Sequence, residues 1–443
     1  MLPKGWVEAT IAELTTVNPK HPSDTDRQQS ASFIPMPAVN EHLGAITDAQ
    51  DRTLGEIWTG YTHFADGDVI FAKITPCMEN GKAAIASGLT NGIACGSTEF
   101  YVFRPDAGFS AAYLWRFLRQ RSFREQAEKH MSGAVGQRRV PRNYLEDHLL
   151  PLPPAAEQHR IVAKLDALTT RLARARAELD RVNNLAIRLR YETLRQWFNL
   201  AEARRTDVPI ATIDDVTTIS SGFGFPKHLQ GRRVGQIPFA KVSDISKAVF
   251  EAAGRLGTAA NFVDAADLSI LKAKPIPAGS TIFAKIGEAL HLNRRAISQV
   301  DIIIDNNCMA LSPKDDLIDS EYLFHFMRTV NLSPFAVATA IPSVRRGDVA
   351  SLELPLPSLI DQRIVARKIR QALARADRLE AEAARARALL DRLEAAILAK
   401  AFRGELVPQD PNDEPASVLL DRVRAQRATA PKAKRGRRKA VGA

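Results

Sequence analysis

The sequence predicts an α+β protein in which two duplicated domains are separated by two long helices that pair as an antiparallel coiled coil. Three observations predict this fold class. The chain repeats itself at an interval near 204 residues, each copy mixes strand-like and helical runs, and each copy ends in a sustained heptad pattern. At 443 residues the chain is long enough for two or three domains of roughly 150 residues each.

Four pairs of matching segments carry the internal repeat. They include ATIAELTTV with ATIDDVTTI, the pentapeptide IFAKI in both copies, and YLWRFLR with YLFHFMR. In chain order the pairs are 9–17 with 211–219, 70–74 with 282–286, 113–119 with 322–328, and 150–162 with 354–365. Because the matches are collinear, they indicate the duplication of one domain and a pseudo-twofold relation between the copies.

Each copy begins with strand-like runs that are bounded by Gly, Pro, Asn and Asp. A short amphipathic helix follows, with its apolar residues on one face. The expected strands are 68–74 and 99–103 in the first copy and 280–286 and 301–304 in the second, and the expected helices are 113–118 and 322–327. This mixture favours an α+β domain in each copy.

A Leu-Pro-Leu-Pro segment then leads into a long helix in each copy. Pro153 and Pro154 suit a helix N-terminus, and Ser358 with Asp361 has the spacing of a capping box. Apolar residues continue from there in alternating steps of four and three, which is typical of a coiled-coil seam. The first seam is Ile161, Leu165, Leu168, Leu172, Ala175, Leu179, Val182, Ala186 and Leu189; the second is Val365, Ile369, Ala372, Ala376, Leu379, Ala383, Ala386, Leu390, Leu393 and Ile397.

Two such helices in one chain are expected to pack against each other, which buries both seams. The alternative is that each helix pairs with another chain. The expected domain limits are 1–153 for the first domain, 154–200 for the central helix, 201–356 for the second domain, 357–404 for the second long helix, 405–428 for a C-terminal helical segment and 429–443 for a disordered basic tail.

The charge is concentrated at the end of the chain. The formal net charge is +11, which by itself points to a polyanionic partner such as nucleic acid. Residues 421–443 carry 9 basic and 1 acidic side chains, whereas 1–153 carry 15 and 17 and 201–356 carry 17 of each. Any specific contact between the folded domains and DNA must therefore come from local patches.

Composition and motifs exclude several classes of function. The three cysteines form no C-x-x-C pair, and the start MLPKGWVEAT has no apolar signal core, so we expect a soluble, cytoplasmic protein. The Asp/Glu-x-Lys signature of common metal-dependent nucleases is absent from the sequence. The Walker A loop of nucleotide-driven motors, the Asp/Asn-Pro-Pro-Tyr/Phe tetrapeptide of amino-methyltransferases and the His-Glu-x-x-His metal site are absent as well. Scattered histidines (His21, His42 and His63) have no ligand spacing, so no metal site and no catalytic residues are predicted.

Two domains held apart by a rigid rod suit the reading of two half-sites on one duplex. Arg, Lys, Asn and Gln are the usual readers of base edges, although for each candidate a solvated surface charge is the alternative. The candidates are Lys73, Asn80, Lys82, Gln137, Arg138 and Arg139 in the first domain, and Lys241, Lys285, Arg294, Arg295, Arg345 and Arg346 in the second. Candidates that recur in both copies are the favoured DNA contacts. These are Lys73 with Lys285, and the basic pair 138–139 with the basic pair 345–346.

The pattern resembles the specificity (S) subunit of type I restriction-modification enzymes. The resemblance rests on the two Leu-Pro-Leu-Pro-x-x-x-Glu/Asp-Gln-x-Arg-Ile-Val helix entries, on DVIFAKITPCMENGKAA at 68–84 and on AFRGELVPQDPNDEPASVLLDRVR at 401–424. It covers the chain from Leu2 to about Arg427. The second domain keeps the strand of the hallmark but lacks its Cys-Met-Glu-Asn-Gly-Lys part, and the basic tail lies outside the pattern.

The resemblance implies that the two domains are target-recognition domains that read an asymmetric bipartite DNA sequence. It also implies two modification subunits that methylate adenine with S-adenosylmethionine, restriction subunits that use ATP and Mg²⁺, and long helices that act as spacer and docking surface. No cofactor is then expected in this chain. The alternative function is a non-catalytic coiled-coil scaffold that oligomerises and binds protein partners.

Overall fold

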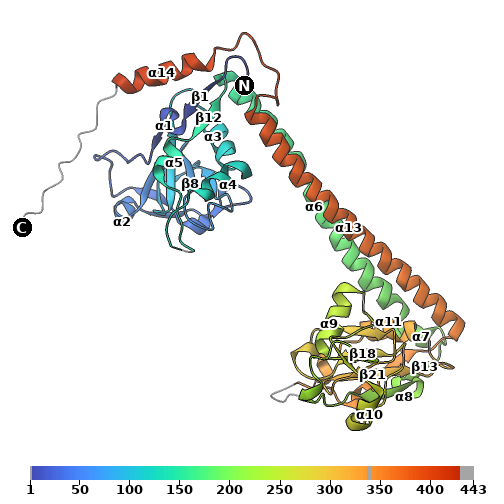
Figure 1. Cartoon of the computed structure of the whole chain (residues 1–443). Helices are drawn as coiled ribbons and strands as arrows, with labels where there is room; N and C mark the ends of the chain where they lie inside the picture. Colours follow the sequence, from blue (N-terminus) through green and yellow to red (C-terminus); the bar gives the residue numbers. More distant parts are fainter. Residues whose placement is uncertain (1, 135, 337–341, 430–443) are drawn as a thin grey trace, which may run out of the picture. The chain divides into compact units, whose positions relative to one another are not determined.

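The computed structural model describes residues 2–134, 136–336 and 342–429. The chain divides into two compact units, one from residues 1–178 and 386–443 and one from residues 179–385. Each unit holds one globular domain and a part of each of the two long helices (Figure 1). Within the described residues, no helix combines the length and the apolar character needed to cross a membrane.

The first domain is built on two four-stranded sheets. Antiparallel pairing joins β2 (Thr15–Val17), β11 (Phe100–Pro105), β8 (Val69–Ala72) and β9 (Ala83–Ile85) in that order. The second sheet has the order β6 (Gln50–Thr53), β3 (Ser30–Ile34), β10 (Ile93–Gly96) and β7 (Thr62–Ala65), with β3 and β10 parallel. Two short pairs complete the domain: β1 (Val7–Thr10) with β12 (Leu149–Leu152), and β4 (Val39–Asn40) with β5 (Ala45–Ile46).

The core of the first domain follows from its continuous apolar runs. All four residues of β8, VIFA, are buried, because α3 (Ala111–Leu118) covers one side of this strand and the second apolar cluster fills the other. Tyr113 and Phe117 of α3 meet Phe402 at ring-centroid distances of 5.0 and 5.3 Å. The end of the second long helix is thereby part of the core of the first domain.

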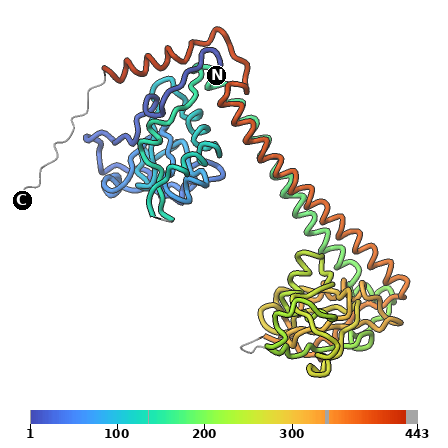
Figure 2. Tube along the Cα trace, viewed as in Figure 1, coloured from blue at the N-terminus to red at the C-terminus, as the bar shows by residue number. Residues whose placement is uncertain are grey.

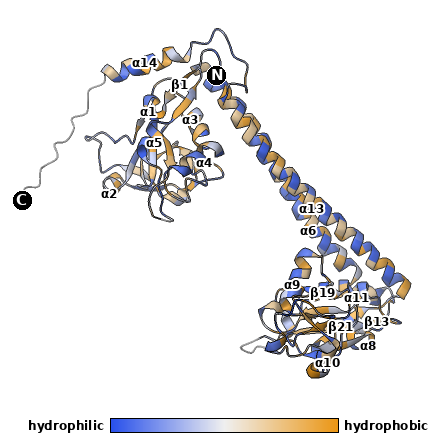
Figure 3. Cartoon of the chain, viewed as in Figure 1, coloured by the Kyte–Doolittle hydropathy of each residue, from blue (hydrophilic) through white to orange (hydrophobic). Residues whose placement is uncertain are grey.

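The second domain repeats this plan with different connections. Its main sheet has the order β14 (Thr217–Ser221), β21 (Cys308–Pro313), β18 (Thr281–Ala284), β19 (Arg295–Ser298) and β16 (Arg255–Leu256). A smaller sheet joins β17 (Asn261–Val263), β15 (Ile237–Ala240) and β20 (Ile303–Ile304), and β13 (Ile210–Thr212) pairs with β22 (Glu353–Pro355). Its longer helices are α9 (Val242–Glu251), α10 (Ala265–Leu271) and α11 (Ser320–Thr329), and apolar strands such as β21 lie at the centre (Figure 3).

Equivalent elements confirm the duplication. The repeated Ala-Thr-Ile segments form α1 (Ile11–Leu14) and α8 (Ile213–Val216), and each begins with a capping box, Thr10 with Glu13 and Thr212 with Asp215. The order β2-β11-β8 recurs as β14-β21-β18. A threonine hydroxyl and a carboxylate satisfy the free N–H groups at the same place in both copies, so the repeated letters specify the same local structure.

The long helices are α6 (Ala155–Trp197) and α13 (Leu359–Phe402), and they lie side by side in each unit (Figure 2). In the first unit, Arg176 of α6 binds Asp391 and Glu394 of α13, while the start of α6 shares a core with the end of α13. In the second unit, Arg190 binds Asp377 and Glu380. The pairing is therefore antiparallel within each unit, as expected.

All residues of the two predicted seams except one are at least partly buried. Leu393 is 49 % exposed, so its assignment to the seam is wrong. Glu394 takes the inward position at this level because it pairs with the half-buried Arg176, at 2.7 Å. The apolar contacts resume at Ile397 and Ala401, which belong to the core of the first domain. A polar pair thus replaces one apolar layer of the coiled coil.

The C-terminal segment of the described chain lies on the first domain. Helix α14 (Ala416–Thr429) buries Ala416 and Leu420 in the core of that domain. The backbone N–H of Ala416 donates to the carbonyl of Gly5, and Arg424 binds Glu13 of α1 at 2.6 Å. Apart from Thr429, the basic tail predicted for residues 429–443 lies outside the described residues.

Candidate nucleic-acid interface

Lys73 and Lys285 occupy equivalent positions just after the central strands β8 and β18. The carbonyl of Lys73 accepts the backbone N–H of Val140 at 2.9 Å, and the carbonyl of Lys285 accepts that of Val344 at 2.9 Å. In both domains this bond joins the end of the central strand to a loop that arrives about 60 residues later. The recurrence expected for these two lysines is therefore confirmed at the level of the backbone.

The side chain of Lys73 is held within the first domain. Its ammonium donates to the carbonyl of Thr98 at 2.7 Å and lies 5.0 Å from the ring centre of Tyr101, and burial lowers the pKa of the amine. Beside it, Arg139 binds Glu99 through two parallel hydrogen bonds of 2.8 and 2.9 Å. Lys73 and Arg139 are therefore tied to the fold, and a contact with DNA would require them to give up these partners.

Lys82 and Arg138 differ in how firmly they are held. Lys82 is 14 % exposed at its side chain and pairs with Glu41 at 3.4 Å, which anchors the turn between β4 and β5. Arg138 reaches Glu79 and Glu128 only at 3.5 Å from each, and 39 % of its side chain is exposed. Long, exposed ion pairs are weak in water, so Arg138 is the more available cation of the two.

Two exposed candidates of the first domain lie on neighbouring loops. Asn80 is exposed on the loop 75–82, and Gln137 is exposed on the loop 132–140, of which residue 135 is not described. The loops touch, because the backbone N–H of Thr75 donates to the carbonyl of Arg138 at 3.0 Å. We call the exposed side chains of Asn80, Gln137 and Arg138 the first reader set, since they combine amide groups and one cation on adjacent loops.

In the second domain, Lys285 is the most available of the basic candidates near the central strand. Its ammonium has no hydrogen-bond or ion-pair partner among the described residues. Lys241 by contrast reaches Gln230 at 3.4 Å and lies 4.9 Å from the ring centre of Phe225. Lys241 therefore supports the loop 225–230, whereas the side chain of Lys285 would give up no hydrogen bond or ion pair to a described residue on binding a ligand.

The neighbouring arginines Arg294 and Arg295 have structural roles. Arg295 is 3 % exposed, and it donates to the carbonyls of Met327 and Val330 and to the side chain of Asn293. Burial lowers its pKa to about 9. The prediction that Arg295 binds DNA is corrected here, because its side chain lies inside the domain and its donors are engaged. Arg294 donates to Ser246 at 2.8 Å and remains half-buried.

The basic pairs 138–139 and 345–346 are not equivalent, contrary to expectation. Isolated bridges pair Ile74 with Arg139 in the first domain and Ile286 with Ser343 in the second. Ser343 is thus the counterpart of Arg139, and the two basic pairs flank the equivalent valines on opposite sides. Arg345 is exposed at the start of α12 (Arg346–Ala350), where Arg346 also lies on the surface.

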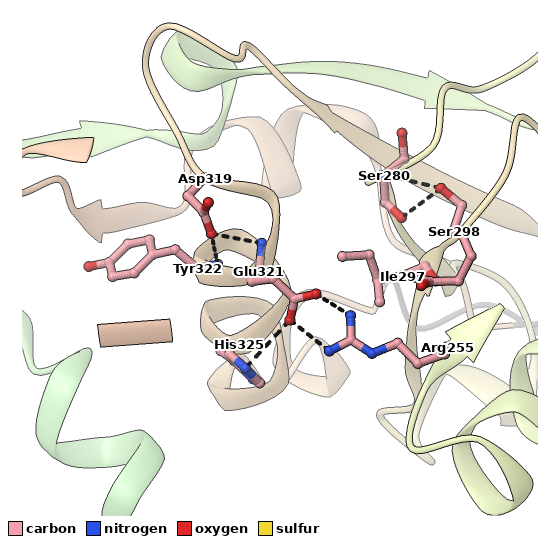
Figure 4. Close-up of polar contacts among 9 residues, drawn as sticks. Arg255, Ser280, Ile297, Ser298, Asp319, Glu321, Tyr322 and His325 are labelled. Carbon is pink, nitrogen blue, oxygen red and sulfur yellow. Dashed lines mark hydrogen bonds and ion pairs between the residues drawn. The ribbon is translucent and has the colours of Figure 1, made fainter. Parts of the chain in front are cut away.

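A polar network holds α11 against the main sheet of the second domain (Figure 4). Arg255 of β16 makes a two-pronged ion pair with Glu321, and Glu321 lies 3.9 Å from His325. The carboxylate of Asp319 caps α11, while the hydroxyl of Ser298 accepts the backbone N–H of Ser280 at 3.0 Å. Burial lowers the pKa of His325 to about 4, so this ring is neutral at pH 7.

The structure also shows exposed basic residues that the sequence analysis missed. They lie on two connections of the second domain, before β15 and after α10: Lys227, Arg233, Lys272 and Lys274. These exposed residues could be predicted from the sequence, because basic residues recur there in short segments that contain Gly or Pro and are typical of surface loops. Among the described residues, one group is close enough to hold a metal ion, namely His21, His63 and Cys95.

Comparison with known proteins agrees with the duplicated architecture. Residues 3–184 and 206–385 each match the type I restriction modification DNA specificity domain. The chain belongs to this family. The two matched segments each contain one globular domain and part of a long helix.

Relatives in the family differ in how much of their length is shared. The EcoEI specificity subunit of Escherichia coli is 42 % identical over 168 residues, which is 38 % of this chain and 28 % of that protein. The EcoAI specificity subunit of the same species gives 41 %, with the same shares of the two chains. The chain thus aligns with less than a third of these two relatives, whereas 99 % of it aligns with 99 % of the EcoKI specificity subunit of E. coli K12, at 22 % identity.

Solved structures support the fold. A chain from a study of complex assembly and conformational transition of the type I R-M system superposes with a TM-score of 0.74, at 22 % identity over 92 % of this chain and 100 % of that chain. The HsdS subunit of Thermoanaerobacter tengcongensis gives a TM-score of 0.65, at 23 % identity over 91 % of this chain and 98 % of that chain. These specificity domains therefore share their arrangement of strands and helices at low identity.

Proposed function

We propose that this chain is the DNA sequence-specificity subunit of a type I restriction-modification complex. Each specificity domain reads one half of an asymmetric bipartite target, and the paired helices α6 and α13 set the spacing between the halves. One observation carries this proposal: the two domains share a backbone framework, but they expose different side chains. The frames agree down to single backbone bonds at Lys73 and Lys285, while the exposed groups around them differ.

The first reader set offers two amides and one arginine, which suits bidentate contacts with adenine and guanine in the major groove. The second domain offers the free ammonium of Lys285 and the exposed Arg345. The two domains present different side chains near their central strands and are expected to read unlike bases, so the target is asymmetric. Phosphate contacts from the flanking basic residues, such as Lys274, fix the register without reading sequence.

The chemistry belongs to partner subunits in this proposal. Two modification subunits dock on the long helices and methylate adenine with S-adenosylmethionine, and restriction subunits supply the ATP- and Mg²⁺-dependent cleavage. This chain then carries no catalytic residue and no catalytic cofactor. The scaffold alternative is less favoured, because it gives no reason for two frames that differ chiefly in their exposed polar side chains.

The test is selection from a randomised duplex library by the full chain in complex with its modification subunit. The proposal expects enrichment of two short, different sequences at a fixed separation. Recovery of DNA without any enriched sequence would support the scaffold alternative. A complex formed with the modification subunit alone serves as the control, since it lacks both reader surfaces and should select nothing.

A further inference from the structure

His21, His63 and Cys95 meet on one face of the sheet β6-β3-β10-β7. Strands β7 and β10 pair antiparallel with His63 directly opposite Cys95, and opposite residues project to the same face. His21, from the connection between β2 and β3, completes the group, with its ring centre 4.8 Å from that of His63. All three side chains are buried, and one potential ligand atom from each lies within 4.8 Å of the others.

The hydrogen bonds of the two imidazoles to carbonyl groups assign the proton of each ring to Nε2. Nε2 of His21 lies 2.9 Å from the carbonyl of Ala94, and Nε2 of His63 lies 2.8 Å from the carbonyl of Trp58. A carbonyl oxygen only accepts, so Nε2 carries the proton in each neutral ring and Nδ1 keeps its lone pair. Histidine ligands of metal ions usually donate their second N–H to a carbonyl or carboxylate in this way.

One further contact reaches this group. The backbone N–H of His21 points to Nδ1 of His63 at 3.4 Å, which is longer than a normal N–H hydrogen bond. The sulfur of Cys95 has no hydrogen bond among the described residues. Among the described residues, Nδ1 of His21 and the thiol of Cys95 therefore have no hydrogen bond, and Nδ1 of His63 has one long hydrogen bond that a metal ion would displace.

Lys20 acts on all three side chains as a nearby positive charge, so a metal ion must bind against this repulsion. Burial lowers the pKa of both histidines, so they are neutral at pH 7, and it raises the pKa of the Cys95 thiol to about 11. A metal ion displaces the thiol proton and stabilises the thiolate, which the buried site alone does not. Arg104 and Asp68 act on His21 with opposite signs.

We propose that His21, His63 and Cys95 form a zinc site in the first domain, with Nδ1 of each histidine and the thiolate of Cys95 as its three protein ligands. Zinc favours nitrogen and sulfur donors in a tetrahedral arrangement, in which neighbouring ligand atoms lie about 3.3 to 3.8 Å apart. Since the ligand atoms lie within 4.8 Å of one another, the side chains must approach by about 1 Å to bind the ion. The ion fastens the β2–β3 connection to the two strands.

Cobalt binding to the full chain tests this proposal directly. The chain is stripped with a chelator, titrated with Co²⁺ and then with Zn²⁺, and followed by absorption spectroscopy. The expected result is one equivalent of Co²⁺ with a thiolate-to-cobalt charge-transfer band and tetrahedral visible bands, both removed by one equivalent of Zn²⁺. A titration of the wild-type chain without a thiolate band would overturn the proposal, whatever the variants do.

Variants identify the ligands. Cys95→Ser is expected to abolish the charge-transfer band and to weaken zinc binding at least tenfold, measured by competition with a chromophoric chelator. Cys77→Ser and His42→Ala are the matched controls and should change neither, because Cys77 lies outside the group and His42 is exposed. Unchanged zinc affinity in Cys95→Ser, or loss of the band in Cys77→Ser, would also contradict the site.

Discussion

The side-chain carbonyl of Gln158, in the first turn of α6, accepts the backbone N–H of Ser110 at the start of α3 over 2.9 Å. Gln362 does the same for Asp319 at the start of α11, over 2.8 Å. Both glutamines are fully buried, and each also donates to the carbonyl of a proline just before its own helix. These two amides join each specificity domain to its long helix.

Gln158→Ala should loosen the junction of the first domain. The change leaves the N–H of Ser110 and the carbonyl of Pro153 without partners in a buried place, which costs about 1–3 kcal/mol of stability for each buried group. Hydrogen exchange is expected to accelerate in α3 and in the first turns of α6. Gln196→Ala, an exposed position on the same helix, is the control, and equal exchange rates in the two variants would contradict this role.

Acid should destabilise the second domain through His325. Its pKa is about 4 in the folded state, lowered first by burial and then by Arg328, and about 6.5 in the unfolded chain. The unfolded state therefore binds more protons below pH 6.5, so stability falls as the pH drops from about 6.5 toward 4. Between pH 7 and pH 5 the loss is about 2 kcal/mol.

The measurement is hydrogen exchange of the α11 amides at pH 7 and pH 5, corrected for the intrinsic pH dependence of exchange. His325→Gln should remove most of the pH dependence, because glutamine does not titrate in this range. His291→Gln, an exposed histidine of the same domain, should keep it. The same pH dependence in His325→Gln as in the wild type would exclude His325 as the cause.

Gln137→Ala and Arg345→Ala should each relax sequence preference in one half of the target. A bidentate contact with a base accounts for about 1–3 kcal/mol of discrimination, or roughly 5- to 150-fold. Selection from a randomised duplex library, with the complex carrying each variant, reads out the half that changes. An effect on both halves, or a uniform loss of affinity with a lower salt slope, would identify these residues as phosphate contacts instead.

Arg139→Ala is expected to behave differently from Gln137→Ala, although the two residues are near neighbours. Its guanidinium is paired with Glu99, so removal leaves an unpaired carboxylate and destabilises the first domain. The thermal unfolding midpoint of the first domain should fall, whereas Gln137→Ala should leave it unchanged. Unchanged stability together with altered sequence preference in Arg139→Ala would return Arg139 to the reader set.

The secondary structure of this protein was predicted well from local sequence patterns, because these patterns depend on interactions between residues that are close in the chain. The capping boxes at Thr10 and Thr212 and the apolar steps of α6 all depend on near neighbours. Leu393 failed for a reason outside its own helix, since Arg176 of α6 draws Glu394 inward. The heptad pattern of one helix does not show where a charged residue of the partner helix will form an ion pair.

The candidate interface was harder to predict, because exposure and pairing depend on residues that are distant in sequence. Arg295 reads as a surface cation, yet the carbonyls of Met327 and Val330 enclose it. The group of His21, His63 and Cys95 spans 75 positions of the chain, so no spacing rule reveals it. In contrast, the structural equivalence of Lys73 and Lys285 was predictable, because duplication repeats their neighbours.

Lengthening the coiled coil should move the two halves of the target apart. Seven residues inserted in α6 after Glu178, with seven in α13 after Arg385, keep the heptad pattern and add about 10 Å of helix. At 3.4 Å per base pair, the non-specific spacer should grow by about three base pairs. The same insertion in α6 alone breaks the pairing and is the control for loss of assembly. An unchanged spacer with full activity would exclude the helices as a ruler.

Sequencing of methylated adenines in a host that carries this chain with its modification subunit is the direct test of bipartite recognition. We predict one bipartite motif with two unlike halves at a fixed separation, and the loss of that motif when this chain is deleted. Methylation at a single continuous motif, or an unchanged methylation pattern in the deletion, would contradict it.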